Sequence, residues 1–315
     1  MGSGLALWLW YRIRGPREVP DEIKPLEGRE REVKIITALA AALCLAATLS
    51  TMALAIESIP QADNFESYAL GTYLVTSAQD GWGDSATTDA NRYTIIEKSL
   101  LDGNANNQVA HIVDKPQAAA NTHLRTNFWS SSSQFPTSGI YDVIMDICPL
   151  QTNGAFKIAI TNGGSWTSGT NWLAAVGFGS DGGNTFFPGM TTGNHFGTQS
   201  VAGTGTVWLD TPVSYSANTW YTLRFSMNPG TAEYRAFVGE RGGTATELTT
   251  GWTHYILGLV SNYSLGGFYI ATSNKPGEGA ELLLDNVRVV PEPSSLMALA
   301  FGGMGLIGFA RRRKS

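Results

Sequence analysis

Tyr141-Asp142-Val143-Ile144-Met145-Asp146-Ile147 places an apolar or aromatic side chain at every odd position and its two carboxylates at even positions. Successive side chains of a β-strand point to opposite faces, so this pattern predicts a strand with one buried face. Trp220-Tyr221-Thr222-Leu223-Arg224-Phe225 alternates in the same way, with Tyr221, Leu223 and Phe225 on the buried side. We therefore expect strands that bury one face only, with Asp142 and Asp146 facing solvent.

Short runs rich in β-branched and aromatic residues recur between Asp63 and Val290, separated by clusters of Gly, Asn, Ser and Pro. Many short strands without a long amphipathic helix predict an all-β domain, a two-sheet sandwich that occupies residues 56–290. The candidate strands are residues 93–97, 108–113, 123–129, 140–147, 156–161, 172–178, 206–209, 220–227, 234–238, 267–272 and 281–290.

The composition supports a folded, acidic domain. Hydrophobic residues make up 43% of the chain, which is enough for a core, and the 36 glycines and 15% charged residues are typical of secreted β-proteins. Residues 56–293 hold 10 Lys and Arg against 20 Asp and Glu. Such a domain repels phosphate backbones, so we expect no nucleic-acid partner.

The two cysteines do not predict a disulfide framework. Cys44 lies inside an apolar segment near the amino terminus, and Cys148 has no histidine next to it in the sequence. We expect Cys148 to be a small buried hydrophobic residue rather than a nucleophile.

Residues 33–55 have the pattern of a secretory signal peptide. An apolar stretch at 35–54 follows Arg29, Arg31 and Lys34, and it ends in Ala53-Leu54-Ala55, a small-x-small cleavage signature. An uncleaved membrane anchor is the alternative. Residues 1–32 have no periodicity that would build a domain, so we interpret them as a non-native or disordered extension.

The carboxy-terminal segment, residues 291–315, has three parts. Pro291-Glu292-Pro293 is followed by the uncharged residues Leu296 to Ala310 and then by Arg311, Arg312, Arg313 and Lys314. A helix of that apolar length spans only about 22 Å, short of the roughly 30 Å hydrocarbon core, which makes it a marginal transmembrane helix. The two prolines should keep their segment extended and outside the preceding strand, and the arginines favour the cytoplasmic side.

This order of parts resembles the PEP-CTERM sorting signal. The resemblance implies that Pro291, Glu292, Pro293, Arg311, Arg312 and Arg313 are recognised by an exosortase after transient insertion into the inner membrane. It also implies export to the cell surface, outer membrane or extracellular matrix of a Gram-negative bacterium. An ordinary single-span tail anchor is the alternative.

A second resemblance concerns the sandwich. Asp63-Asn64-Phe65-Glu66-Ser67-Tyr68 with Gly71, the strand from Trp220 to Phe225, and Leu282 to Val289 resemble segments of concanavalin A-like, laminin G-like jelly rolls. In such folds the first and last strands usually pair. We therefore expect Phe65 and Val287 on neighbouring strands.

Laminarinase-like glycoside hydrolases share this fold, and their motif places Glu, Asp and Glu at alternate positions of one strand. The nearest match here is Asp142, Ile144 and Asp146, which lacks the central carboxylate. The two Asp Cα atoms would lie about 13 Å apart, too far for short side chains to reach the roughly 5 to 9.5 Å of paired-carboxylate hydrolysis. We expect no catalytic residues, and a glycoside hydrolase or lyase remains the alternative function.

Tryptophans beside polar loops are the candidate ligand-binding residues. Flat aromatic faces next to hydroxyl and amide groups can hold a sugar ring, whereas the alternative is that the same rings cap the ends of the sandwich core. The candidates are Trp82, Trp129, Trp166 and Trp172, with Trp252 in a similar loop.

Calcium is the candidate structural ion, although no cofactor is required. Glu66 and Asp285, on terminal strands expected to be neighbours, could share a hard cation with backbone carbonyls. Residues 181–184 offer a second oxygen-rich loop.

These patterns together predict an exported, surface-sorted, non-enzymatic protein. We expect it to be a matrix component, or a carbohydrate-binding or structural component associated with extracellular polysaccharide. Its partners would be an exosortase-type processing enzyme, the inner membrane while the tail is in place, and that polysaccharide.

Overall fold

The computed structural model describes residues 63–74, 82–84, 92–101, 106–115, 123–127, 139–152, 154–162, 172–179, 194–202, 205–256, 265–272 and 279–291. All of them belong to Leu54–Ser315, the second of the two units into which the chain divides. Several predictions lie outside the described residues: the extension 1–32, the signal peptide 33–55 with Ala53 and Ala55, the tail after Pro291, Trp129, Trp166 and the loop 181–184.

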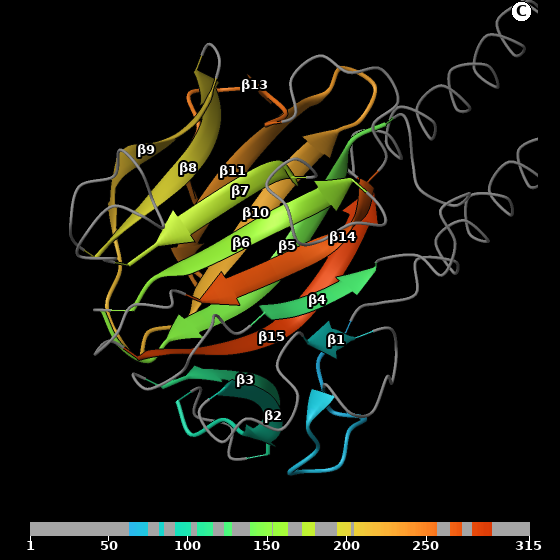
Figure 1. The fold of residues 1–315 in the computed structure, drawn as a ribbon, viewed down its shortest axis with the longest axis vertical. Coiled ribbons are helices and arrows are strands. Elements are labelled where there is room, and N and C mark those ends of the chain that lie inside the picture. The colour runs from blue at the N-terminus through green and yellow to red at the C-terminus, as the bar shows by residue number, and fades with distance from the viewer. Residues whose placement is uncertain are drawn as a thin grey trace, which may run out of the picture. The chain divides into compact units, whose positions relative to one another are not determined.

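Two antiparallel β-sheets form the domain (Figure 1). In spatial order, the seven-stranded sheet consists of β1 (Gly83–Asp84), β4 (His123–Asn127), β14 (Leu265–Thr272), β6 (Phe156–Asn162), β7 (Trp172–Phe178), β8 (His195–Ala202) and β9 (Gly205–Ser214). The eight-stranded sheet consists of β12 (Thr246–Glu247), β11 (Glu233–Glu240), β10 (Tyr221–Asn228), β5 (Tyr141–Pro149), β15 (Ala280–Pro291), β3 (Gln108–Asp114) and β2 (Arg92–Lys98), while β13 (Thr253–His254) also pairs with β11. The predicted all-β, two-sheet sandwich is confirmed.

The last two strands enter the middle of both sheets. β14 lies between β4 and β6, and β15 lies between β3 and β5, so strands from opposite ends of the domain are neighbours. The chain also changes sheet between β3 and β4, between β4 and β5, and between β5 and β6. This arrangement is a jelly-roll sandwich, as predicted.

The core lies between the inward faces of the two sheets. Val143, Met145 and Ile147 of β5 are fully buried there, as the alternation predicts. Aromatic rings of the seven-stranded sheet pack against the same core, and the Phe178 ring lies 5.0 Å from Phe156. Burial of such side chains supplies the main stabilisation of the fold.

The expectation that each strand buries only one face is wrong. Every residue of β7 and β14 is buried, which means that the outer face of the seven-stranded sheet is covered as well. Asp142 and Asp146 lie on the outer face of β5 as predicted, but each is only 6% exposed. Thr222 donates to Asp146 at 2.7 Å and Ser226 donates to Asp142 at 2.5 Å, because the register of β10 places each hydroxyl opposite a carboxylate.

The first described residues close against the last strand. Asp63 and Val287 pair in an antiparallel bridge, which confirms that the two terminal segments are neighbours. Phe65 itself lies in a turn with a φ of 58°, not on a strand. Its ring is fully buried and extends the core.

The end of β15 differs from the prediction at one residue. Pro291 is the last residue of the strand and lies opposite Tyr141, whereas the proline pair was expected to stay outside the strand. A strand's last residue can be proline because no further ladder bond from its nitrogen is required. Within the described ranges, no helix is long and apolar enough to span a membrane.

Candidate functional site

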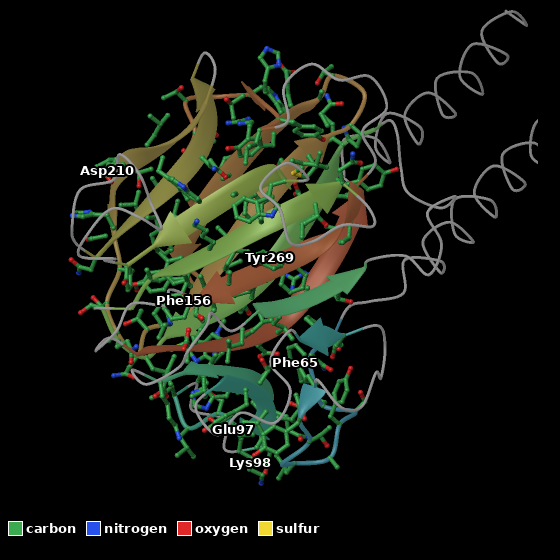
Figure 2. The ribbon with its side chains drawn as sticks, in the orientation of Figure 1. Phe65, Glu97, Lys98, Phe156, Asp210 and Tyr269 are labelled. Carbon is green, nitrogen blue, oxygen red and sulfur yellow. The ribbon has the colours of Figure 1, made fainter. Side chains whose placement is uncertain are left out.

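The outer face of the seven-stranded sheet carries a second apolar cluster, separate from the core. Phe268 and Ile270 of β14 point into the core, so Tyr269 between them points to the opposite face. Figure 2 labels Tyr269 on this sheet. The cluster contains Ala155, Ala159, Trp172, Ala175, Trp208, Ile256, Tyr269 and Ala271.

Aromatic rings and one ammonium group form a continuous row across this face. The Trp172 and Tyr269 ring centroids lie 5.8 Å apart. The Lys157 Nζ lies 5.6 Å from the Trp172 ring centroid and 5.7 Å from that of Trp208. Lysine at these distances is held by cation–π attraction to both indoles. We call Tyr269, Trp172, Lys157 and Trp208 the aromatic row.

Small residues form the sheet surface beneath the aromatic row. Ala159 lies opposite both Tyr269 and Ala175 in the strand register. Lys157 lies opposite Gly177, and Gly177 lies opposite Gly197 on the next strand. Because these positions carry a methyl group or no side chain, the large rings pack directly over the sheet, and Trp172, Trp208 and Tyr269 are only 7%, 3% and 4% exposed.

Three polar atoms beside the aromatic row are buried and have no hydrogen-bond partner within the described part of the chain. They are the indole nitrogen of Trp172, the hydroxyl of Thr161 and the side-chain oxygen of Gln199. Their residues are 7%, 0% and 6% exposed. Thr161 lies opposite Trp172, and Gln199 lies opposite Trp208. Leaving a buried polar group unpaired costs about 1–3 kcal/mol, so these atoms call for partners from elsewhere.

The predicted ligand-binding tryptophans lie in different environments in the structure. Trp172 belongs to the aromatic row. Trp82 is only 2% exposed, and its indole N–H donates to Asp63 Oδ2 at 2.6 Å. Its ring lies 5.3 Å from Phe65 in the core, which favours the core-capping alternative for Trp82. Trp252 is 39% exposed and lies 5.9 Å from the Arg235 guanidinium.

Glu66 and Asp285 have separate partners in the structure. Glu66 Oε1 accepts the backbone N–H of Gln108 at 2.9 Å, and Asp285 Oδ2 accepts the Asn107 amide at the same distance. Burial raises the pKa of Asp285, although Asn107 and the backbone N–H of Asn286 donate to it. No group of three or more His, Cys, Asp or Glu among the described residues could hold a metal ion. Calcium at Glu66 and Asp285 stays a prediction, and an unfolding midpoint unchanged by chelator would contradict it.

The carboxylates and the aromatic row lie on different sheets. Asp142 and Asp146 are on the outer face of the eight-stranded sheet, where Arg224 lies 3.6 Å from Asp142. The aromatic row is on the seven-stranded sheet. The best hydrolytic pair and the best aromatic surface therefore cannot serve one bound molecule.

Sequence analysis missed three members of the aromatic row: Lys157, Trp208 and Tyr269. Trp208 and Tyr269 fell within predicted strands, but Tyr269 is flanked by Phe268 and Ile270, so no alternation marks its face. Lys157 alternates with the buried Phe156 and Ile158 and could have been assigned to the outer face. Its contact with two indoles depends on the pairing of β6 with β7, β7 with β8 and β8 with β9, which no local pattern shows.

The comparison with protein families concerns the end of the chain. Residues 289–314 match the PEP-CTERM protein-sorting motif. The chain carries a PEP-CTERM sorting signal. The matched span contains all six predicted motif residues, from Pro291 to Arg313, and confirms the resemblance noted in the sequence. This signal is a substrate signal for exosortase processing, and it implies export through the membrane and sorting to the bacterial cell surface.

The sandwich is similar to several solved structures at low sequence identity. The catalytic domain of the glycoside hydrolase family 131 protein from Coprinopsis cinerea is 10% identical, with a TM-score of 0.41, and the match covers 72% of this chain and 85% of that one. Peanut lectin is 12% identical, with a TM-score of 0.37 and coverages of 66% and 97%. The globular domain of T. cruzi calreticulin is 10% identical, with a TM-score of 0.45 and coverages of 76% and 95%. No curated protein matches the sequence.

Proposed function

We propose that this protein is a non-enzymatic, surface-sorted component that binds extracellular polysaccharide through the aromatic row. The observation that carries the proposal is the group of buried polar atoms that have no hydrogen-bond partner among the described residues and lie beside neighbouring aromatic rings. The protein would then contribute to the matrix or surface polysaccharide of a Gram-negative bacterium, at the cell surface, in the outer membrane or in the extracellular matrix.

The unpaired atoms match the hydrogen-bonding capacity of a sugar. The Trp172 indole can only donate a hydrogen bond, whereas the Gln199 side-chain oxygen can only accept one. A sugar hydroxyl accepts and donates, so neighbouring hydroxyls on one ring can satisfy both atoms. Thr161 can do either and fits the same ligand.

The rings and the ammonium group add shape and charge. A pyranose has an apolar face that packs on an indole or phenol ring, and the sheet residues beneath these rings are small. Lys157 provides a positive charge between Trp172 and Trp208. We therefore expect acidic sugars, such as uronates, to bind more tightly than neutral ones.

The sorting signal supplies the location. An exported protein held at the surface meets polysaccharide outside the cell and has little access to nucleotides or cytoplasmic metabolites. The position of Asp142 and Asp146, on the other sheet and engaged with Ser226 and Thr222, favours binding over glycoside hydrolysis.

The test uses the full chain and polysaccharide extracted from the bacterium that produces it, fractionated into neutral and uronate-rich oligosaccharides. We expect binding of the uronate-rich fraction. Trp172→Phe, which removes the indole N–H and keeps an aromatic ring, should weaken binding about 5- to 10-fold, equivalent to one hydrogen bond of about 1 kcal/mol. Trp252→Phe is the matched control and should bind normally. Absence of binding to every fraction, or equal affinity of the Trp172 and Trp252 variants, would contradict the proposal.

A further inference from the structure

The sorting motif begins inside the folded domain. Its match starts at residue 289, whereas β15 continues to Pro291. Val289 lies opposite Val143, Val290 opposite Asp142, and Pro291 opposite Tyr141 in the ladder with β5. The first three residues of the motif therefore belong to an interior strand of the eight-stranded sheet, and the Val289 side chain packs in the core.

This overlap leaves very little chain between the sandwich and the apolar run. Only residues 292–295 separate Pro291 from Leu296, where the uncharged run begins. Even fully extended, the path from Pro291 to Leu296 reaches at most about 18 Å. The polar headgroup region of one leaflet is itself about 5–8 Å thick, so Pro291 can lie at most about 10–13 Å from the outer surface of the bilayer.

The strand register identifies the end of the sandwich that lies nearest. Tyr141 is the first residue of β5 and pairs with both Pro291 and Met227. One residue further, Asn228 pairs with Glu233 at the turn between β10 and β11. Figure 1 shows β10 and β15 ending where β5 begins. We call residues 139–141 and 228–233 the proximal edge.

We propose that the proximal edge rests on the outer surface of the membrane while the sorting tail is in place. The lipid headgroups are then its partner, and the domain is held in one orientation rather than tethered freely. This inference rests on the proposed entry of Leu296 to Ala310 into the membrane and is independent of the polysaccharide proposal.

The chemistry of the proximal edge suits this contact. Its turn consists of Asn228-Pro229-Gly230-Thr231-Ala232, which carries no charge, and Gly230 and Thr231 are exposed. Uncharged groups can approach headgroups without the desolvation penalty that a charged side chain would incur. Glu233, which begins β11 at the proximal edge, is half-buried, whereas Glu240 at the opposite end of β11 is exposed and is followed by Arg241. A tyrosine at the proximal edge, Tyr141, is also of the type that favours membrane interfaces.

The experiment places one fluorophore at either end of β11 in the full chain, reconstituted in phosphatidylcholine and phosphatidylglycerol vesicles. Thr231→Cys carries the label at the proximal edge and Thr244→Cys carries it at the distal turn; both threonines are exposed. Cys44→Ser is present in both variants, and Cys148 is fully buried. Headgroup-linked nitroxide lipids then quench any label close to the bilayer.

We expect the Thr231 label to lose most of its fluorescence and the Thr244 label to retain it. Insertion of a flexible linker of about 20 residues after Glu292 should abolish the difference, because such a chain lets the domain move away. Equal quenching of the two labels in protein that co-floats with vesicles would overturn the orientation. Failure to co-float would overturn the membrane premise itself, and oligosaccharide binding, measured separately, would be unaffected by either result.

Discussion

The side-chain amide of Asn286 donates a hydrogen bond to Asp146 on the neighbouring strand at 2.9 Å and another to Asp285 at 3.2 Å. Asn286 lies where the register between β15 and β5 shifts, and its φ is 51°. The irregularity directs one amide toward two carboxylates that lie opposite each other. It also lets the backbone of the next residue, Val287, pair with Asp63.

Two replacements of Asn286 separate the contribution of its side-chain hydrogen bonds from that of its tolerance for a positive φ. Asn286→Gly removes the hydrogen bonds but tolerates the positive φ, and it should lower the free energy of unfolding by about 2–3 kcal/mol because two buried carboxylates each lose a donor. Asn286→Ala should cost about 1 kcal/mol more, since alanine resists the left-handed conformation. Chemical denaturation measures both values. An alanine variant as stable as the glycine variant would argue against strain at this position.

The bond between Trp82 and Asp63 gives a second prediction. Trp82→Phe removes the indole donor to a carboxylate that is itself only 8% exposed, so the unfolding free energy should fall by at least about 2 kcal/mol. Trp252→Phe, at an exposed ring, should change it by less than about 0.5 kcal/mol. Thermal and urea unfolding measure both variants. If Trp82→Phe and Trp252→Phe lowered the unfolding free energy equally, the core-capping interpretation of Trp82 would be wrong.

Asp285 and Glu247 should affect the pH dependence of stability in opposite directions. Burial raises the pKa of Asp285, so the folded state binds its proton more tightly than the unfolded state does. Its contribution to stability is present below the ordinary Asp pKa and is lost as pH rises through the folded-state pKa. The hydrogen bond from Arg235 lowers the pKa of Glu247, so that contribution is present above the ordinary Glu pKa and is lost as pH falls.

Urea unfolding between pH 4 and pH 7 checks this pair. The wild type should gain stability relative to Asp285→Asn as pH falls, and it should lose stability relative to Glu247→Gln over the same range. Each variant controls for the other because both replace a carboxylate with an amide. If the difference in unfolding free energy between wild type and variant changed with pH in the same direction for both variants, the opposite pKa shifts of Asp285 and Glu247 would be refuted.

Cys148 should be inert in the folded protein. Burial raises the pKa of its thiol to about 12, and its side chain packs with Val109, Trp220 and Leu283. The thiolate that reacts with alkylating reagents is therefore scarce at neutral pH. Peptide mass spectrometry should find Cys148 unmodified by iodoacetamide at pH 8 and modified after denaturation. Labelling at equal rates in both states would show that the residue is accessible.

Local alternation predicts much of this fold. It assigns the inward face of β5 and β10 correctly, because a buried face repeats every second residue. It does not find β8, whose sequence His195-Phe196-Gly197-Thr198-Gln199-Ser200-Val201-Ala202 mixes small and polar residues on both faces. That strand lies between β7 and β9, which pair with it on either side, so its place depends on pairing rather than on a local alternation.

The candidate site was only partly predictable for the same reason. Trp172 was among five tryptophans that the sequence places in or beside polar loops, and that pattern alone did not distinguish it from Trp82. The burial of Asp142 could not be foreseen. The alternation along its strand shows which face Asp142 occupies, but it does not show that Ser226 and Arg224 cover that face. Likewise, the place of Lys157 between two indoles depends on the register of three separate strand pairs.

The indole N–H resonance of Trp172 tests the central claim most directly. In a spectrum of the 15N-tryptophan-labelled full chain, assigned with Trp172→Phe, we expect this resonance to shift when uronate-rich oligosaccharide is added, because the N–H gains its missing acceptor. The resonance of the Trp82 indole N–H, which already donates to Asp63, should not shift. A Trp172 resonance that does not move at saturating oligosaccharide would contradict binding at the aromatic row.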